Sequence, residues 1–311
     1  MAARVIDFDN EKTRRGDHLV RGIAADGMIR AFAVTARQTV QDARDAHHTS
    51  PIATAALGRL MMGAQMMGAM MKHPDELMTL TVRGDGPMGG MTVTANANGD
   101  VKGFVNHPNV WLPPNGRGKL DVGGAIGAGS LSVVHDLPGM EPYVSQVELV
   151  SGEIGDDLAS YFALSDQIPT SVGVGVLVDR DLTVKQAGGF ILQLMPGHYE
   201  YLVDDLEANL ADIHSVTDML EDGMGPEDIL RHLLRGMDFE TLDTTPVRFH
   251  CGCNYERASR VMLALGAREL QDMVDKGETG EAYCHFCGKR HTFAPEQLAG
   301  ILAAAQGVPA P

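Results

Sequence analysis

Residues 249–293 read FHCGCNYERASRVMLALGARELQDMVDKGETGEAYCHFCGKRHTF, and this stretch contains all four cysteines of the 311-residue chain. They form a Cys-x-Cys pair, Cys251 and Cys253, and a Cys-x-x-Cys pair, Cys284 and Cys287. Structural zinc sites take four such ligands in a tetrahedron, and two short pairs brought together by a fold supply them. The spacing therefore predicts one Zn²⁺ per chain, bound by these four thiolates, which we call the cysteine cluster.

The residues around the two pairs favour this interpretation. Gly288 directly follows the last cysteine and suits a tight turn that directs backbone N–H groups at thiolates. Basic residues nearby favour the ionised thiol; they are Arg248, Arg257, Arg260, Lys289 and Arg290. Three histidines are possible substitute ligands, but with four thiolates available we expect them at the surface or beside the metal ligands; they are His250, His285 and His291.

A metal at this place also has an energetic reason. The region from Pro246 to Ala294 has about 50 residues, too few for a secure hydrophobic core. A structural zinc contributes on the order of 10–16 kcal/mol of apparent binding free energy to folding, so the region is predicted to unfold without it. From the spacing alone a purely structural zinc is the favoured reading. The alternative is a switch, in which oxidation of the thiolates removes metal and fold together.

Composition limits the class of protein. A chain of 311 residues with 44% apolar residues is long enough for about two globular domains. Its N-terminus, MAARVIDFDNEKTRRGDHLV, has no apolar signal region, and no window approaches the roughly 18 apolar residues of a membrane span. We therefore expect a cytoplasmic protein with reduced thiols. The formal charge of −16 argues against nucleic acid and membrane partners.

The first two thirds of the chain show the pattern of an α+β domain. Runs that alternate apolar residues with Thr or Ser predict strands at 31–36, 77–84, 91–95, 130–136 and 171–179. Asn98-Gly99 predicts a two-residue hairpin turn, because both residues tolerate positive φ. Helices are expected at residues 51–72 and 154–165, and no strand order is assigned.

Several apparent motifs do not carry chemistry. The methionine run at 60–71 places Met62, Met66 and Met70 on one helical face, which we expect to be core or docking surface. GGAIGAG (123–129) and NGRGKL (115–120) lack the residue order of nucleotide-binding loops. No Ser, His and Asp arrangement indicates a triad. The sequence predicts no catalytic residues and no nucleotide cofactor.

The middle of the chain is acidic. Between Gln186 and Leu230 there is no Lys or Arg, while ten acids occur between Glu200 and Asp228. Apolar residues nevertheless recur at helical spacing, and Pro226 can start a helix, so two amphipathic helices are predicted. Isolated helices of this length are marginal in water and need a surface to dock on. The segment is either an ordinary linker or one poised between a docked and an unfolded state.

Four features of the sequence resemble one known family. The spacing of the cysteine cluster, with Glu256 and Arg257 after it, resembles the redox-switch domain of the heat shock protein 33 family of bacterial chaperones. Three upstream blocks are similar to that family's core domain, in the same order: RGDGPMG (83–89), YFALSDQIPT (161–170) and AGGFILQLMPG (187–197). The departures are Gly252 and Asn254, where Thr or Ser is more usual, an extended N-terminus before Gly22 and an Ala-rich tail from Pro295.

This resemblance implies an α+β fold in three parts. They are a chaperone core domain at 1–198, an acidic helical linker at 199–245, and a small zinc-binding redox-switch domain with a short tail at 246–311. We call residues 199–245 the acidic segment.

The resemblance also implies a stress-activated holdase without enzymatic activity. Reduced and zinc-bound, the chain would be an inactive monomer. Oxidation would pair Cys251 with Cys253 and Cys284 with Cys287, release zinc and unfold the acidic segment. The oxidised form would dimerise and hold unfolding client proteins without ATP.

Two other functions compete with the redox-regulated chaperone. One is a zinc-ribbon protein that binds a nucleic acid or a protein partner constitutively. The other is a thiol oxidoreductase that uses Cys284 and Cys287, which is less favoured because no thioredoxin-like βαβ pattern surrounds this pair.

Overall fold

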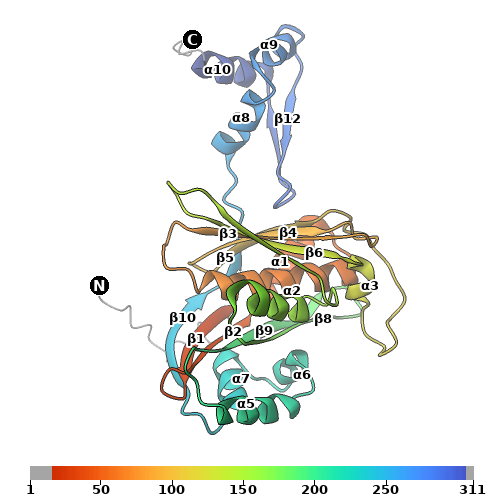
Figure 1. Cartoon of the computed structure of the whole chain (residues 1–311). Helices are drawn as coiled ribbons and strands as arrows, with labels where there is room; N and C mark the ends of the chain where they lie inside the picture. The colour runs from red at the N-terminus through yellow and green to blue at the C-terminus, as the bar shows by residue number, and fades with distance from the viewer. Residues whose placement is uncertain (1–15, 306–311) are drawn as a thin grey trace. The chain divides into compact units, whose positions relative to one another are not determined.

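The computed structural model describes residues 16–305, in which the chain forms two compact units divided between His250 and Cys251. The first unit has two sheets with helices between and beside them (Figure 1). The second is a small helical unit with a two-stranded sheet. The predicted α+β class is confirmed.

Sheet A has five antiparallel strands in the order β10-β1-β2-β9-β8. Their bounds are β10 (Glu240–Pro246), β1 (His18–Ala24), β2 (Ile29–Thr35), β9 (Val184–Leu194) and β8 (Thr170–Val178).

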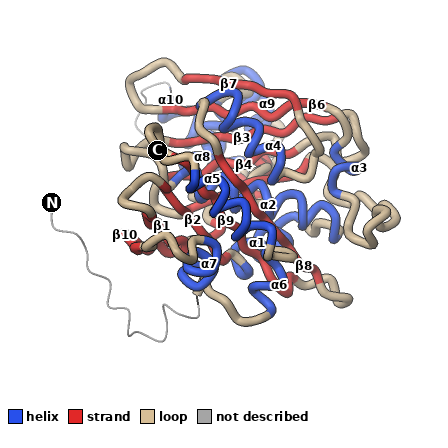
Figure 2. The backbone as a smooth tube through the Cα atoms, turned by 60° about the horizontal axis from the view of Figure 1, so that its bottom comes forward, coloured by secondary structure: helices blue, strands red, loops and turns tan. Residues whose placement is uncertain are grey.

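Sheet B has six strands in the order β11-β5-β4-β3-β6-β7, and only the short β11 pairs with its neighbour in parallel. Their bounds are β11 (Arg248–Phe249), β5 (Asp100–Val105), β4 (Met91–Asn96), β3 (Leu77–Gly84), β6 (Gly129–Asp136) and β7 (Tyr143–Glu148). Figure 2 shows β7, β6, β3 and β4 running side by side.

Helix α2 (Pro51–Gly68) lies between the two sheets and forms the centre of the main core. Ser50 caps its first turn by accepting a hydrogen bond from the Ala53 N–H, and Pro51 occupies the first helical position. Nearly every later residue is buried, as expected for a helix that is apolar on all sides. The methionines Met62 and Met66 are fully buried, so the expectation of a core role holds for them, and Met70 packs partly buried against the same core.

Helix α1 (Arg37–His47) is capped from a distant part of the sequence. Its own N-cap residue, Ala36, makes no side-chain cap. The Asp17 carboxylate instead accepts hydrogen bonds from the Thr39 N–H and hydroxyl at 2.6 and 2.7 Å. The chain just before β1 therefore holds the start of α1, and residues from Asp17 onward belong to the core fold. The prediction of an extension before Gly22 was therefore wrong for residues 17–21. Residues 1–15, which hold most of the polar N-terminal stretch, lie outside the described part.

The five predicted strands all occur, within one or two residues of their expected bounds. Strands β1, β7, β9 and β10 were not predicted. Three of them, β1, β7 and β10, lie at or next to the edge of a sheet and carry polar or charged residues instead of a clear alternation, whereas β9 is a nearly continuous buried strand inside sheet A. Their positions depend on pairing with strands far away in the sequence.

The predicted Asn98-Gly99 turn joins β4 to β5, but its geometry differs from the prediction. Gly99 has a positive φ of 82°, whereas Asn98 does not adopt this conformation. The Asn96 side chain instead accepts hydrogen bonds from the N–H groups of Asn98 and Asp100. The connection is thus a three-residue loop stabilised by an Asn side chain, a form that also places glycine at its left-handed position.

The helix predicted at 154–165 is a shorter α-helix followed by a π-helical turn. Helix α4 spans Gly155–Tyr161 and the turn η1 spans Phe162–Asp166. The buried Asp157 carboxylate accepts four backbone N–H bonds, from Val150, Ser151, Gly152 and Ile154. Turns of π type inside or after α-helices frequently occur at functional sites. A short helix, α3 (Val122–Ile126), completes the core domain.

The acidic segment contains three helices where two were predicted. Helices α5 (Tyr201–Ala211), α6 (Val216–Glu221) and α7 (Pro226–Leu233) cover the outer face of sheet A (Figure 1). The extra break falls before Ser215, whose side chain caps α6. Pro226 starts α7 as predicted, and Ile229, Leu230 and Leu233 behind it are fully buried. Nine of the ten acids between Glu200 and Asp228 are exposed, Glu227 being the exception, while the apolar residues form a second core with sheet A.

The end of the acidic segment is a strand of sheet A. Strand β10 pairs with β1 from His18↔Pro246 to Ile23↔Glu240, so residues 240–246 are extended and not helical. The chain then reaches sheet B through β11, and the compact-unit boundary falls after His250. The three-part division at 198 and 245 stays a prediction about how the chain behaves.

The second unit is built from three helices and a hairpin. They are α8 (Tyr255–Leu263), α9 (Ala267–Asp275), β12 (Gly280–Tyr283), β13 (Arg290–Phe293) and α10 (Pro295–Ala305). Its core consists of seven buried residues. Two of them, Leu298 and Leu302, belong to α10, so the Ala-rich stretch from Pro295 forms a packed helix. Residues 306–311 lie outside the description.

Among residues 16–305, no helix combines the length and apolar composition that a membrane crossing requires.

Within the described residues, two ion pairs join the acidic segment to the core strands: Lys185 of β9 pairs with Glu221 of α6, and His18 of β1 pairs with Glu227 of α7. The His18 Nε2 of β1 lies 3.4 Å from a Glu227 carboxylate oxygen of α7, and its Nδ1 lies 2.8 Å from the Gly16 carbonyl oxygen. A carbonyl and a carboxylate only accept hydrogen bonds, so both ring nitrogens must carry a proton for both bonds to form. Burial lowers the pKa of His18, but its bonds with Glu227 and Gly16 outweigh this and raise it overall. For Glu227 burial acts in the opposite direction and raises the pKa. The hydrogen bond with His18 outweighs this effect, so the pKa of Glu227 is lowered overall.

This pair predicts a pH-dependent contribution to stability. The His18 contribution is complete below its unfolded pKa, about 6.5, and is lost as pH rises through the raised value; the Glu227 contribution is present above about 4.5 and is lost as pH falls through the lowered value. The pair should therefore stabilise most between about pH 4.5 and 6.5. The unfolding free energy of the wild type, minus that of His18→Gln, should fall by up to about 1 kcal/mol between pH 6 and pH 9. Denaturant unfolding across this range measures it, and a constant difference would contradict the assignment.

Candidate metal centre

Two turns present the cysteine cluster. Cys251 and Cys253 lie between β11 and α8, and Asn254 caps α8 by accepting a hydrogen bond from the Arg257 N–H. Cys284 and Cys287 lie in the turn that joins β12 to β13. Gly252 and Gly288 have positive φ values of 57° and 69°, a conformation that glycine adopts without strain. The structure thus brings together all four predicted site residues.

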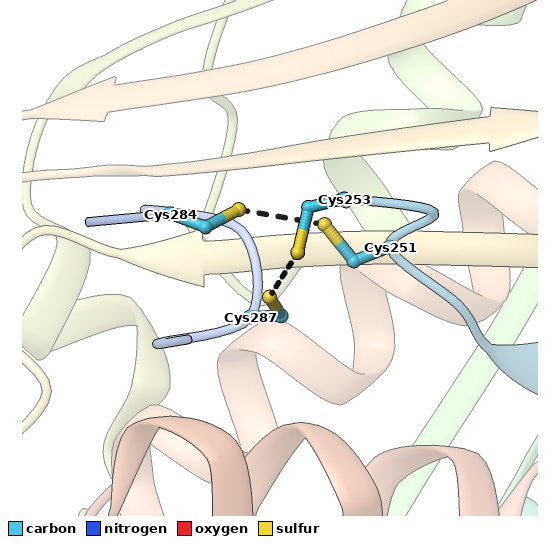
Figure 3. A group of neighbouring side chains, drawn as sticks. All are labelled: Cys251, Cys253, Cys284 and Cys287. Carbon is cyan, nitrogen blue, oxygen red and sulfur yellow. Dashed lines mark hydrogen bonds between the residues drawn. The ribbon is translucent and has the colours of Figure 1, made fainter. Parts of the chain in front are cut away.

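The four sulfur atoms converge on one point (Figure 3). All lie within 4.8 Å of one another. Two close separations run between the two motifs, 3.5 Å from the Cys251 sulfur to the Cys284 sulfur and 3.3 Å from the Cys253 sulfur to the Cys287 sulfur. Zn–S bonds of about 2.3 Å in a tetrahedron place the sulfurs about 3.8 Å apart. The cluster has the residue types and the size for a tetrahedral metal ion, and it could hold one.

Backbone N–H groups face the sulfur atoms, as predicted from Gly288. The Cys253 N–H interacts with the Cys251 sulfur, those of Phe286 and Cys287 with the Cys284 sulfur, and that of Lys289 with the Cys287 sulfur. The turn itself is held by the Gly288 N–H donating to the Cys284 carbonyl at 2.8 Å. Such N–H groups stabilise thiolates, because they place positive partial charge next to the ionised sulfur.

The thiols need a positive charge to ionise together. Burial and then the hydrogen bond with Cys284 raise the pKa of Cys251 to about 11. Burial also raises the pKa of Cys287, whereas for Cys284 bonds from Cys251 and Cys287 outweigh burial and lower the pKa. Four adjacent thiolates repel one another, so a bound cation is the group that would allow all of them to deprotonate.

The nearby basic residues favour ionisation of the thiols less than predicted. Three of the five form ion pairs with acids: Arg248 with Asp100, Arg260 with Glu256 and Arg290 with Glu281. Arg257 donates to the Gly252 carbonyl at 3.1 Å and so supports the first turn. Burial, neighbouring sulfurs and backbone N–H groups are the main influences on the thiols.

The histidines lie outside the cluster. Within the part of the chain that the structure describes, the metal-binding group consists of the four cysteines alone. His285 packs edge-on against Tyr283, with ring centroids 5.5 Å apart. Sequence reasoning did not find the contribution of α10 to the core beneath the cluster, because its Ala-rich composition resembles a tail.

Comparisons with known proteins agree with the fold and the site. The sequence profile of the family described as "Hsp33 protein" matches residues 17–294. The "33 kDa chaperonin" of Agathobacter rectalis is 50% identical over 282 residues, which cover 91% of this chain and 98% of that protein. The protein of the same name from Bacillus subtilis is 45% identical, covering 92% and 98%.

A solved structure is similar in fold as well as in sequence. The crystal structure of the 33 kDa chaperonin, a heat shock protein 33 homologue, from Thermotoga maritima superposes with a TM-score of 0.86 at 37% identity. The match covers 94% of this chain and all of that one. Fold, cysteine cluster and relatives together define a chaperone class. The chain belongs to the Hsp33 family.

The geometry predicts the metal content of the reduced protein. We expect one zinc per fully reduced chain, because four sulfur ligands converge at tetrahedral spacing. Elemental analysis measures this, and thiol titration should show more reactive thiols after a chelator is added. The variant Cys284→Ser should lose most of the zinc, whereas the control His285→Ala should keep it. Well under one zinc per chain, or a titration unchanged by the chelator, would rule the site out.

Proposed function

We propose that this chain is a redox-regulated holdase. Reduced and zinc-bound it is inactive; after disulfide formation, loss of zinc and unfolding of the acidic segment it binds unfolding proteins. The observation that carries the proposal is the convergence of all four cysteines of an Hsp33-family chain on one point in a unit with only seven buried core residues.

In the reduced state the cysteine cluster holds the small unit folded. When bound, Zn²⁺ would supply four covalent-like links between two turns and neutralise the thiolates. The residues that would hold it are Cys251, Cys253, Cys284 and Cys287. A core of seven buried residues gives little stability by itself, so folding of this unit depends on these links.

Oxidation removes the links. Each pair of thiolates loses two electrons as one S–S bond forms, and hydrogen peroxide takes up these electrons together with two protons from solvent to give two water molecules. A disulfide sulfur is no longer a thiolate ligand, so the first disulfide halves the ligand set. We propose Cys251–Cys253 and Cys284–Cys287 as the final pairs.

Loss of the small unit would then loosen the acidic segment. The chain runs from α7 through β10 and β11 to Cys251, so the acidic segment is continuous with the unit that melts, while β10 pairs with β1 and β11 pairs with β5. The segment carries many acids, and its helices depend on the outer face of sheet A for their stability. Its release would expose apolar residues on both surfaces, among them Val20 and Ile29 of the sheet and Ile229 of α7. Such surfaces bind unfolded polypeptides.

The remaining features of the proposal follow the family resemblance. The three functional parts are residues 1–198, 199–245 and 246–311. The chain would act in the cytoplasm, as a monomer when reduced and a homodimer when oxidised. It would bind clients without catalysing a reaction.

The decisive experiment compares suppression of aggregation by reduced and oxidised protein. Peroxide-treated chain should prevent aggregation of a thermally unfolding client, and reduced zinc-bound chain should not. Reduction with a dithiol in the presence of zinc should reverse the gain. Equal activity in both states would favour constitutive binding by a zinc ribbon, and turnover of a disulfide substrate without holdase activity would favour an oxidoreductase.

The order of oxidation is a second prediction. Two residues between Cys284 and Cys287 allow a disulfide within a turn, whereas one residue between Cys251 and Cys253 demands a tighter ring, even with Gly252. Mild peroxide at low temperature should give first a species with Cys284 bonded to Cys287 and two free thiols.

Mass spectrometry of alkylated peptides over the time course distinguishes the outcomes. The cross-motif neighbours, Cys251 with Cys284 and Cys253 with Cys287, are the rival pairs because their sulfurs lie 3.5 and 3.3 Å apart. An early bridge between the motifs, or an early Cys251–Cys253 bridge alone, would contradict the order.

A further inference from the structure

Strand β7 is an exposed edge of sheet B. It is the last strand in the order of that sheet, and no strand among residues 16–305 pairs with its outer side. Tyr143 and Val144 at its start are 63% and 58% exposed. An edge of this kind can accept another extended segment.

The register shows which backbone groups face outward. The Leu149 N–H, directly after β7, donates to the Gly129 carbonyl of β6 at 2.9 Å. Hydrogen bonding alternates along an antiparallel pair. The N–H and C=O groups of Val144, Gln146 and Glu148 therefore point away from β6. They form a row of donors and acceptors with the spacing of a strand partner.

A hollow of about 360 Å³ opens beside the start of this edge. The β6–β7 hairpin contributes Met140 and Tyr143, and the end of α4 with η1 contributes Tyr161 and Asp166. The Tyr161 hydroxyl lies 3.1 Å from the Ser145 hydroxyl of β7 and so ties η1 to the edge strand. The hollow and the strand edge are thus parts of one surface.

The hollow combines apolar walls with excess negative charge. Three carboxylates line it, Glu76, Glu141 and Asp166, against one base, His135. The His135 Nδ1 lies 3.0 Å from a Glu76 oxygen. Burial raises the pKa of Asp166, against an opposing effect of His135, so an added positive charge nearby would favour its ionised form.

We propose that β7 and this hollow bind an extended polypeptide segment that pairs with the strand edge and places an arginine or lysine side chain in the hollow. The aliphatic stem of such a side chain matches Met140 and the Tyr143 ring, and its charged end matches the carboxylates. Main-chain pairing supplies affinity and the side-chain hollow supplies preference, as in other strand-addition sites. The inference rests on the proposed holdase function, because the segment is part of a client.

Peptides test the ligand chemistry. The probe is an acetylated, amidated peptide of alternating Thr and Val with one central arginine. Its control carries citrulline, which keeps the shape and removes the charge, and a third peptide is N-methylated at alternate residues to block strand pairing. Measured by fluorescence anisotropy with the full oxidised chain, the arginine peptide should bind about two- to fivefold more tightly than the citrulline peptide. The N-methylated peptide should lose most of the binding.

Variants locate the site. Glu141→Gln should weaken binding of the arginine peptide about two- to fivefold and leave binding of the citrulline peptide unchanged. The control Asp26→Asn removes one negative charge from an exposed turn, at a residue with a φ of 53° that asparagine also adopts, and should change neither. Hydrogen exchange should show new protection at the amides of Val144, Gln146 and Glu148 when the peptide is bound.

Equal binding of both peptides, no effect of Glu141→Gln, or unchanged exchange along β7 would overturn the inference. Holdase activity measured on the same preparations separates it from the proposed function. A gain of holdase activity on oxidation with no preference for the arginine peptide overturns the proposed binding site at β7 and leaves the proposed function standing. Peptide binding at β7 without a gain of holdase activity on oxidation supports the binding site and overturns the proposed function.

Discussion

The burial of helix α2 on all sides is the constraint on which the core domain depends. A helix without a polar face must be covered all around, and sheets A and B cover it from opposite sides. Arg59 is its one charged residue, and it reaches Glu153 at 2.5 Å beside α4. This packing fixes the inner faces of both sheets and aligns the strands that carry the rest of the molecule.

Sheet A consequently has two apolar faces, and this makes the acidic segment necessary. Its inner face meets α1 and α2, while Val20, Ile29 and Leu192 point to the other side. Helices α5 to α7 cover that side with their apolar residues and turn most of their acids to solvent. A covering layer with so much like charge is less stable than the sheet beneath it, which suits a layer that is to be released. The His18–Glu227 contact ties this layer to the first strand.

The second unit follows a different principle. Its seven buried residues form a small core, and the cysteine cluster joins the segment before α8 to the turn between β12 and β13. Helix α10 adds Leu298 and Leu302 to this core. In the proposed function, chemistry at four sulfur atoms controls folding of the unit, and folding of the unit controls access to surfaces elsewhere in the chain.

The sequence by itself determined the cysteine cluster, the buried helix with its methionines, the start of α7 at Pro226 and five strands, because each depends on spacing or periodicity within a short window. Only the tertiary structure decided what depends on distant partners. Strand β10 is a strand because β1 lies beside it, Asp17 caps a helix that begins 20 residues later, and α10 is a helix because the small core needs its leucines. The hollow beside β7 likewise arises where residues far apart in sequence, such as Glu76 and Asp166, line one space. Local patterns carry no record of such contacts, since they form only when the chain has folded.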